Sequence, residues 1–215
     1  MEGGNETHTH CGLHAHVEVP DLDHAVLVCN HLRPWLASLV ALSANSPFRD
    51  GRDTGYASWR TAAGDRWPVA GPPMLGVLVR ALVVQALKQV RRGAPGPDVC
   101  PSLLRAAYWR AARDGCAEHA LDVRTGRAVP AGRLLRELVA YIRPALEASG
   151  ELAAVTAAVR RLAGAQDGAD DGGRGPGGCG ARRQRAAFAR RGDTRDVVDE
   201  LIRHTAPAHA AHAAH

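Results

Sequence analysis

Polar and apolar residues alternate with a period of two near the start of the chain, over Thr7–Val19. This spacing places polar side chains on one face of an extended segment and mostly apolar side chains on the other. The pattern predicts one strand, or two strands joined by a bend at Gly12, with the apolar face on the core. The polar face carries four histidines and one acid: His8, His10, His14, His16 and Glu18.

Most of the remaining chain has helical periodicity, interrupted by proline and glycine. Asp21 or Asp23 can cap a helix over residues 23–45, in which Pro34 predicts a kink. A small hairpin is predicted around Thr125–Gly126. Together the elements predict an α+β fold that is predominantly helical. The other predicted helices cover residues 75–92, 101–114, 131–149, 151–163 and 193–205, the last of them capped by Asp193.

Composition agrees with this fold class and adds a charge bias. Of the 215 residues, 46% are hydrophobic but only 4% are aromatic, so the core must consist mostly of Leu, Val and Ala. Basic residues outnumber acidic ones by 27 to 22, and every basic residue except Lys88 is an arginine. Arginine suits phosphates and carboxylates, so anionic small molecules fit this charge as well as nucleic acid does. Codon composition explains the arginine bias more simply.

The segment after Met1 has none of the features of a secretion signal. The most apolar run, residues 74–90, contains Arg80 and Lys88 and therefore predicts no membrane span. Five cysteines without a CxxC pair are typical of a reduced chain. We therefore expect a cytoplasmic protein.

The histidine face allows three interpretations. Imidazoles gathered on one side of a strand need water, metal or phosphate around them. The strand can simply be solvated, or it can hold a structural zinc, although zinc usually takes its ligands from spaced turns. The third interpretation is an active-site strand whose histidines contact a metal-bound nucleotide.

A family resemblance favours the third interpretation. The chain resembles the carboxylate–amine ligases of the glutamate–cysteine ligase type 2 family in five blocks that follow the family's order. They are CGLHAHVEVPDLDHAVLVCNHLRPWLASLVALSANSPFRDGRDTGYASWRT at residues 11–61, RWPVAGPP at 66–73, LLRAAYWRAARDG at 103–115, LDVRTGRAVPA at 121–131 and ARRQRAAFARRGDTRDVVDELI at 181–202.

The resemblance implies a glutamine synthetase-like fold, in which helices pack against an antiparallel sheet that carries the site. The implied reaction joins glutamate to cysteine: ATP phosphorylates the glutamate carboxylate, and the amine then displaces phosphate to form gamma-glutamylcysteine. ATP and Mg²⁺ are the implied cofactors, and charge stabilisation carries most of such chemistry.

The same resemblance implies roles for individual residues. On the histidine strand, His14 is the candidate metal ligand, Glu18 a further one, and His16 a ligand of the nucleotide phosphates. In the GRDTGYASWRT block, Arg52 and Arg60 would act in catalysis by pairing with carboxylate or phosphate. The remaining candidates are Thr54 and Tyr56 for the substrate, and Arg182 and Arg185 for ATP.

The chain also departs from the family pattern. It begins just before the histidine strand, where relatives carry an earlier strand expected to ligate magnesium. It also continues directly from Pro73 into a helical segment, where relatives insert several dozen residues. Few carboxylates remain to hold a metal in this region: Glu18, Asp50, Asp53 and Asp65.

These departures leave three functional interpretations. The chain can be a ligase, or it can be a non-catalytic remnant or one part of a split ligase that acts only with a partner. An arginine-rich nucleic-acid binder is the third, and it lacks the expected long stripe of arginines interleaved with aromatics.

The expected organisation is a partial ligase catalytic domain at residues 1–164 and a flexible Gly/Asp-rich linker at 165–180. A C-terminal helical segment of the same domain would follow at 181–205, and a His/Ala tail at 206–215. Expected partners are small molecules (glutamate, and cysteine or another amine), with neither nucleic acid nor a membrane. Exposed strand edges would also favour a homo-oligomer or a complementing chain.

Overall fold

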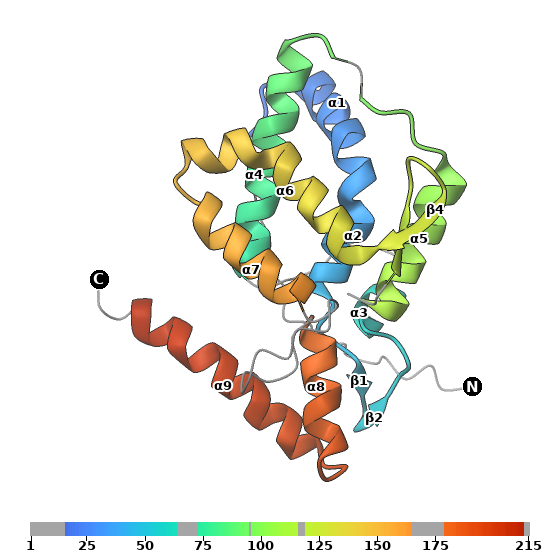
Figure 1. The fold of residues 1–215 in the computed structure, drawn as a ribbon, viewed down its shortest axis with the longest axis vertical. Coiled ribbons are helices and arrows are strands. Elements are labelled where there is room, and N and C mark those ends of the chain that lie inside the picture. The colour runs from blue at the N-terminus through green and yellow to red at the C-terminus, as the bar shows by residue number, and fades with distance from the viewer. Residues whose placement is uncertain (1–15, 64–72, 95, 116–118, 165–178, 213–215) are drawn as a thin grey trace, which may run out of the picture.

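The computed structural model describes residues 16–63, 73–94, 96–115, 119–164 and 179–212. It confirms a predominantly helical α+β fold (Figure 1). In chain order the helical elements are α1 (Leu22–Leu32), the 3-10 segment η1 (Arg33–Trp35), α2 (Leu36–Ser43), α3 (Trp59–Ala63), α4 (Pro73–Arg91), α5 (Pro101–Asp114), α6 (Ala131–Ala148), α7 (Leu152–Gly164), α8 (Gly180–Ala189) and α9 (Thr194–His212).

The first helix bends as the sequence predicts. The side chain of Asp21 accepts a hydrogen bond of 2.8 Å from the backbone N–H of His24 and so caps α1. Pro34 lies in η1, where the chain changes direction between α1 and α2. The run Leu22–Ser43 is long and apolar enough to span a membrane by length and composition. Nearly all of α2 is buried inside the protein, which is the pattern of a core helix.

The core forms where α2, α4, α5 and α6 pack together, with α7 against α6 (Figure 1). Its largest fully buried side chains include Leu78, Leu82, Leu138 and Ile142. Alanines fill much of the remaining space, as the low aromatic content predicts. The small side chains allow neighbouring helices to approach closely without large cavities.

The strands of the described residues form two separate hairpins. β3 (His119–Asp122) pairs antiparallel with β4 (Arg127–Pro130), which confirms the hairpin predicted around Thr125–Gly126. β1 (Phe48–Arg49) pairs with β2 (Arg52–Asp53) across a tight turn. Asp50 and Gly51 in this turn have φ of 49° and 76°, the left-handed values that a two-residue hairpin requires.

Only the end of the predicted histidine strand, residues 16–19, lies in the described part of the chain, and it forms no strand there. The alternation itself persists: Val17 and Val19 pack towards Val28 of α1 and the adjoining part of α4, whereas His16 and Glu18 are exposed. The pattern thus predicted burial correctly at these residues. A strand also needs a neighbour for its backbone hydrogen bonds, and the described residues place none beside this segment.

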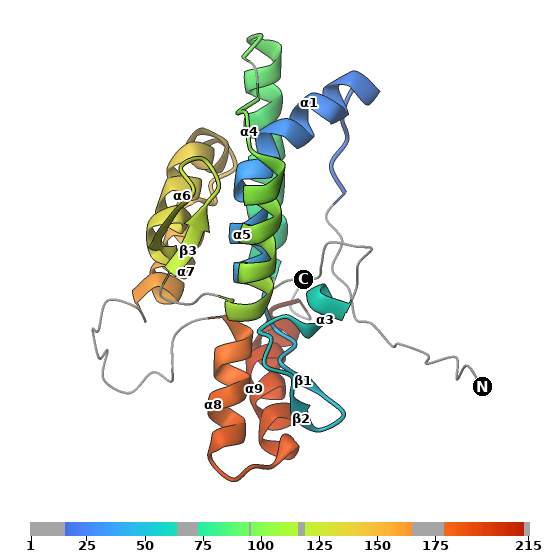
Figure 2. The same cartoon turned by 90° about the vertical axis from the view of Figure 1, so that its right-hand side faces the viewer.

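The helices α8 and α9 form an antiparallel pair that extends from one end of the molecule (Figure 2). Asp193 accepts a hydrogen bond of 2.8 Å from the backbone N–H of Arg195, as expected of a cap for α9. The helix continues to His212, beyond the end predicted at Thr205. The predicted linker falls mainly on residues 165–178, outside the described residues.

We expect Leu82→Ala to lower the free energy of unfolding by about 2–5 kcal/mol, because Leu82 is fully buried and the substitution leaves a cavity. Leu22→Ala is the matched control, since Leu22 is 78% exposed and should change stability by about 0.5 kcal/mol or less. Urea denaturation followed by circular dichroism measures both. Equal effects of the two substitutions would contradict this packing.

Candidate functional site

The candidate site is built on the loop between α2 and α3, which is bonded to the end of α5. The backbone N–H groups of Ala57 and Ser58 donate hydrogen bonds of 2.8 Å to the carbonyl oxygens of Arg113 and Ala112. The N–H of Gly115 adds a 2.8 Å bond to the carbonyl of Ala111. The last carbonyls of α5 would otherwise lack helical partners. The loop therefore caps the helix, and the helix in turn fixes the loop.

Thr54 holds the middle of the same loop. Its Oγ1 donates a hydrogen bond of 2.8 Å to the carbonyl of Pro47 and accepts one of 3.3 Å from the N–H of Tyr56. The Tyr56 ring then meets the Trp59 ring edge-on, with 5.8 Å between centroids. In this geometry Thr54 orients Tyr56 through the backbone.

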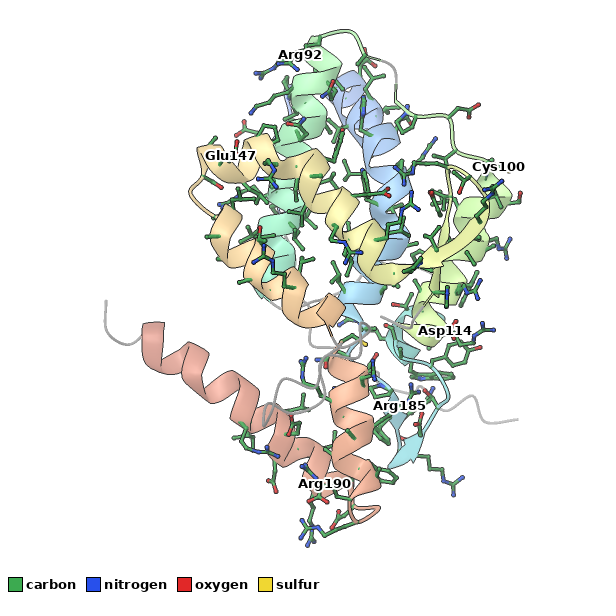
Figure 3. All side chains as sticks on the ribbon, viewed as in Figure 1. Arg92, Cys100, Asp114, Glu147, Arg185 and Arg190 are labelled. Carbon is green, nitrogen blue, oxygen red and sulfur yellow. The ribbon has the colours of Figure 1, made fainter. Side chains whose placement is uncertain are left out.

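Arg185 of α8 joins the C-terminal helices to this loop. Its guanidinium donates to both carboxylate oxygens of Asp53, at 2.7 and 2.8 Å, and to the carbonyl of Tyr56 at 3.0 Å (Figure 3). The hydrogen bond from Arg185 lowers the pKa of Asp53, and the same bond raises the pKa of Arg185. This two-pronged contact makes Arg185 a positioning residue for the loop.

The first turn of α8 packs tightly against the same region. Gln184 donates a hydrogen bond of 2.7 Å to Oδ1 of Asn45, and the N–H of Ala181 donates to the carbonyl of Ala44 at 3.0 Å. A Cβ on Gly180 would lie only 1.8 Å from the Asn45 Oδ1. Only glycine fits this approach without a shift of the Asn45 side chain.

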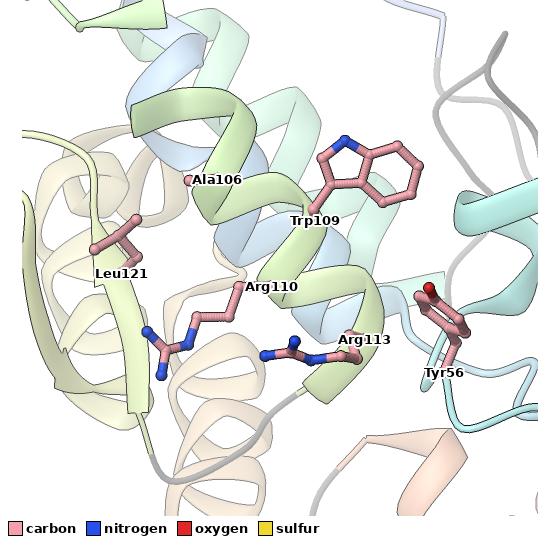
Figure 4. Close-up of a pocket in the computed structure, with 6 residues that line it drawn as sticks. All are labelled: Tyr56, Ala106, Trp109, Arg110, Arg113 and Leu121. Atoms are coloured by element: carbon pink, nitrogen blue, oxygen red, sulfur yellow. The ribbon is translucent and has the colours of Figure 1, made fainter. Parts of the chain in front are cut away.

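A pocket of about 580 Å³ opens between the loop and α5 (Figure 4). Arg110 and Arg113 enter it from α5, and their guanidinium groups lie on the flank of the helix away from Trp109. Arg113 donates to both oxygens of Asp114, at 2.8 and 3.2 Å, and this hydrogen bonding raises its pKa. The other lining residues are Tyr56, Ala106, Trp109 and Leu121.

The structure brings several of the predicted site residues together at this loop. Thr54 and Tyr56 lie in the loop, Arg60 is half-buried in α3, and Arg185 contacts the loop from α8. Arg52 is exposed on β2, directly opposite Arg49 in the hairpin. Arg182 is exposed on α8, with its backbone N–H bonded to the carbonyl of Cys179 at 3.1 Å.

The predicted histidine half of the site lies elsewhere. The segment 16–19, which contains His16 and Glu18, packs through Val17 and Val19 beside α1 and α4. The loop with β1 and β2 lies at the end of the molecule where α8 docks (Figures 1 and 2). His14 lies outside the described residues. The described end of the predicted histidine strand therefore packs on a different part of the molecule from the hairpin β1–β2 and α8.

The described residues do not supply a magnesium site. No three of their His, Cys, Asp or Glu side chains gather closely enough to hold a metal ion. The carboxylates nearest the pocket are engaged by arginines: Asp53 by Arg185, and Asp114 by Arg113. Magnesium needs several free oxygen ligands, so we derive no step through a metal.

Sequence reasoning did not single out Arg110 and Arg113, although both lie in the block LLRAAYWRAARDG. Their spacing of three places them on adjacent turns of one helix face, which is a visible signal in a predicted helix. The pocket also needs Tyr56 from a segment more than fifty positions away, and helical periodicity carries no information about that neighbour.

The chain belongs to glutamate–cysteine ligase family 2, whose model matches residues 3–76 and 74–200. A relative from Frankia alni, "Putative glutamate--cysteine ligase 2-2", is 37% identical over 91% of this chain and 62% of its own length. "Putative glutamate--cysteine ligase 2" from Salinispora arenicola is 36% identical over 92% of this chain and 64% of its own length. The chain thus spans less than two thirds of these curated relatives.

The comparison also locates an internal gap. The alignment with the Frankia alni relative runs over 251 positions but includes 91% of the 215 residues, which is about 196. About 55 positions of that alignment are therefore present in the relative and absent here. The two parts of the family match meet at residues 74–76, at the start of α4. This agrees with the gap expected after Pro73.

We expect Arg185→Gln and Asp53→Asn each to destabilise the protein, and the double variant to lose less than the sum of the two. A partly exposed pair of this kind should give a coupling energy of about 1 kcal/mol in a double-mutant cycle followed by urea denaturation. Arg182→Gln, an exposed change on the same helix, is the control and should show no coupling to Asp53→Asn. Additive effects of the Arg185 and Asp53 changes would argue against the pair.

The same pair should make stability depend on pH. Because the folded-state pKa of Asp53 is lowered, its contribution is present above the unfolded pKa of about 3.9 and is lost as pH falls through the folded value. The stability difference between the wild type and Asp53→Asn should therefore be largest near neutral pH and shrink at low pH. Denaturation curves at intervals from pH 7 to pH 3 measure it, and a difference that grows on acidification would refute the assignment.

Proposed function

We propose that this chain takes part in ATP-dependent carboxylate–amine ligation, with glutamate as the carboxylate substrate and cysteine or another amine as the acceptor. The observation that carries the proposal is the family match, because it includes both the loop at residues 52–60 and Arg185, which holds that loop in place. The names of the relatives support the same reaction class.

In this proposal the arginines of the loop bind charge on the substrate. Arg52 is exposed on the hairpin and available to a carboxylate or phosphoryl oxygen, and Arg60 follows in α3. Thr54 fixes Tyr56, whose ring lines the pocket, and Arg185 holds both in place through Asp53 and the Tyr56 carbonyl. Positioning and electrostatic stabilisation are the main contributions that a protein makes to this kind of reaction.

ATP is the proposed cofactor, and when bound it supplies the phosphoryl group that activates a carboxylate. His16 and Arg182 are the proposed phosphate contacts. His14 and Glu18 remain the proposed ligands for Mg²⁺, although the described donors do not form a complete site for it. The proposed setting is the cytoplasm, with a second copy or a complementing chain as the macromolecular partner.

The full chain, incubated with ATP, Mg²⁺, glutamate and cysteine, should release phosphate in a manner that depends on both amino acids. Changing His14 and His16 together to Ala should abolish release without changing the helical circular dichroism signal. His119→Ala, on the exposed end of β3, is the control and should leave release unchanged.

Two results would count against the proposal. Release that survives the double histidine change refutes the metal role of His14 and the phosphate role of His16. Binding of labelled ATP without any release would instead favour a non-catalytic chain, or one that needs a complementing partner.

A further inference from the structure

Arg110 and Arg113 bring more positive charge to the pocket beside α5 than the described side chains there neutralise. Both arginines face the same carboxylate: the Nε of Arg113 lies 2.8 Å from Asp114, and the Nε of Arg110 lies 3.8 Å from it. Like charges three positions apart on a helix repel each other. One carboxylate shared by two guanidinium groups leaves one positive charge without a partner among the described residues.

The Nε of Arg110 has a more specific requirement. This atom is buried and has no hydrogen-bond partner within the described part of the chain. Its contact with Asp114 at 3.8 Å is an ion pair but too long for a hydrogen bond. Buried polar groups without partners are rare in native proteins, because each costs about 1–3 kcal/mol. The site is thus one acceptor short at Arg110, one of the residues that line the pocket (Figure 4).

The end of a helix normally disfavours an anion, because its free carbonyls carry partial negative charge. At the end of α5 this effect is reduced. The carbonyls of Ala111, Ala112 and Arg113 accept hydrogen bonds from Gly115, Ser58 and Ala57. These carbonyls therefore offset little of the positive charge of the two arginines, and that charge can attract an anion.

The remaining walls suit a small organic ligand. Tyr56, Trp109 and Leu121 add aromatic and apolar surface to the pocket lining, with Trp109 on the other flank of α5 from the two guanidinium groups (Figure 4). A volume of about 580 Å³ lies within the range of small-molecule sites, roughly 300–1,000 Å³. A ligand that combines an oxyanion with a short apolar stem matches both features.

We propose that this pocket is an oxyanion-binding subsite, in which Arg110 and Arg113 bind a carboxylate or phosphoryl group of a small ligand. The identity of the ligand as a ligase substrate rests on the proposed function. Binding of the oxyanion itself does not require catalysis. The oxyanion can come from an amino-acid carboxylate or from a phosphate, and both would bind the arginines through negatively charged oxygens. Titration with each compound distinguishes the two ligands.

Isothermal titration calorimetry of the full chain without ATP tests the subsite, with L-glutamate in one arm and inorganic phosphate in the other. At least one should bind, and Arg110→Gln and Arg113→Gln should each weaken that binding about tenfold or more, since each removes charge-assisted hydrogen bonds. Arg105→Gln is the matched control: it removes the same charge from an exposed position on the same helix and should change affinity less than about twofold.

Arg110→Lys and Arg113→Lys keep the charge but lose the planar guanidinium, so intermediate losses support direct contact. Circular dichroism identifies any variant that does not fold, and the lysine pair then carries the test. Equal losses for Arg105→Gln, or no binding of either anion, would overturn the subsite. The chain can also release no phosphate and still bind an anion that the pocket variants bind more weakly. That result supports the subsite and refutes only catalysis by this chain.

Discussion

The capping of α5 by the loop between α2 and α3 is the contact on which the rest of the candidate site depends. Two backbone N–H groups, from Ala57 and Ser58, satisfy carbonyls at the end of α5. Because these bonds are made by the backbone, they fix the loop whatever side chains follow. Tyr56 precedes them directly, so its ring enters the pocket as a consequence of the cap. A helix end thereby becomes one wall of a ligand site.

A second constraint is the long-range contact of α8 with the same loop. Arg185 and Asp53 are 132 positions apart, and their bond joins the C-terminal helices to the hairpin β1–β2. Phe188 adds an aromatic contact with Phe48, with 4.9 Å between the ring centroids. Gly180, the first residue of α8, leaves room for the Asn45 side chain. An ion pair, an aromatic contact and a glycine therefore lie in the same short interface between α8 and the loop. Each of them is compatible with the observed loop geometry.

The sequence predicts the helices well because their boundaries are local. Pro34 gives the bend, Pro101 and Gly115 delimit α5, and Thr125–Gly126 gives the hairpin. The alternation at residues 16–19 predicts the burial of the valines but not the absence of a strand, which depends on a neighbour elsewhere. The partners of Arg185 and the pocket around Arg110 lie beyond any local pattern, because distant segments create them. Sequence reasoning selected Arg185 as an ATP contact, which stays a prediction, and it had no signal for the bond to Asp53 that the structure shows.

The positions of the histidine segment and the arginine loop, the two halves of the predicted site, matter for the ligation reaction. Phosphoryl transfer and amine attack require reacting atoms about 3–3.5 Å apart, in a geometry that the protein holds fixed. In the described chain the histidine segment packs beside α1 and α4, while the arginine loop is fixed to α5 and α8. The gap of about 55 positions follows both of them in sequence, after α3 and at the start of α4. An anion subsite at Arg110 and Arg113 needs neither the missing positions nor the histidine segment, since the loop, α5 and Leu121 of β3 line it. Anion binding can therefore persist where the ligation step requires a complementing chain.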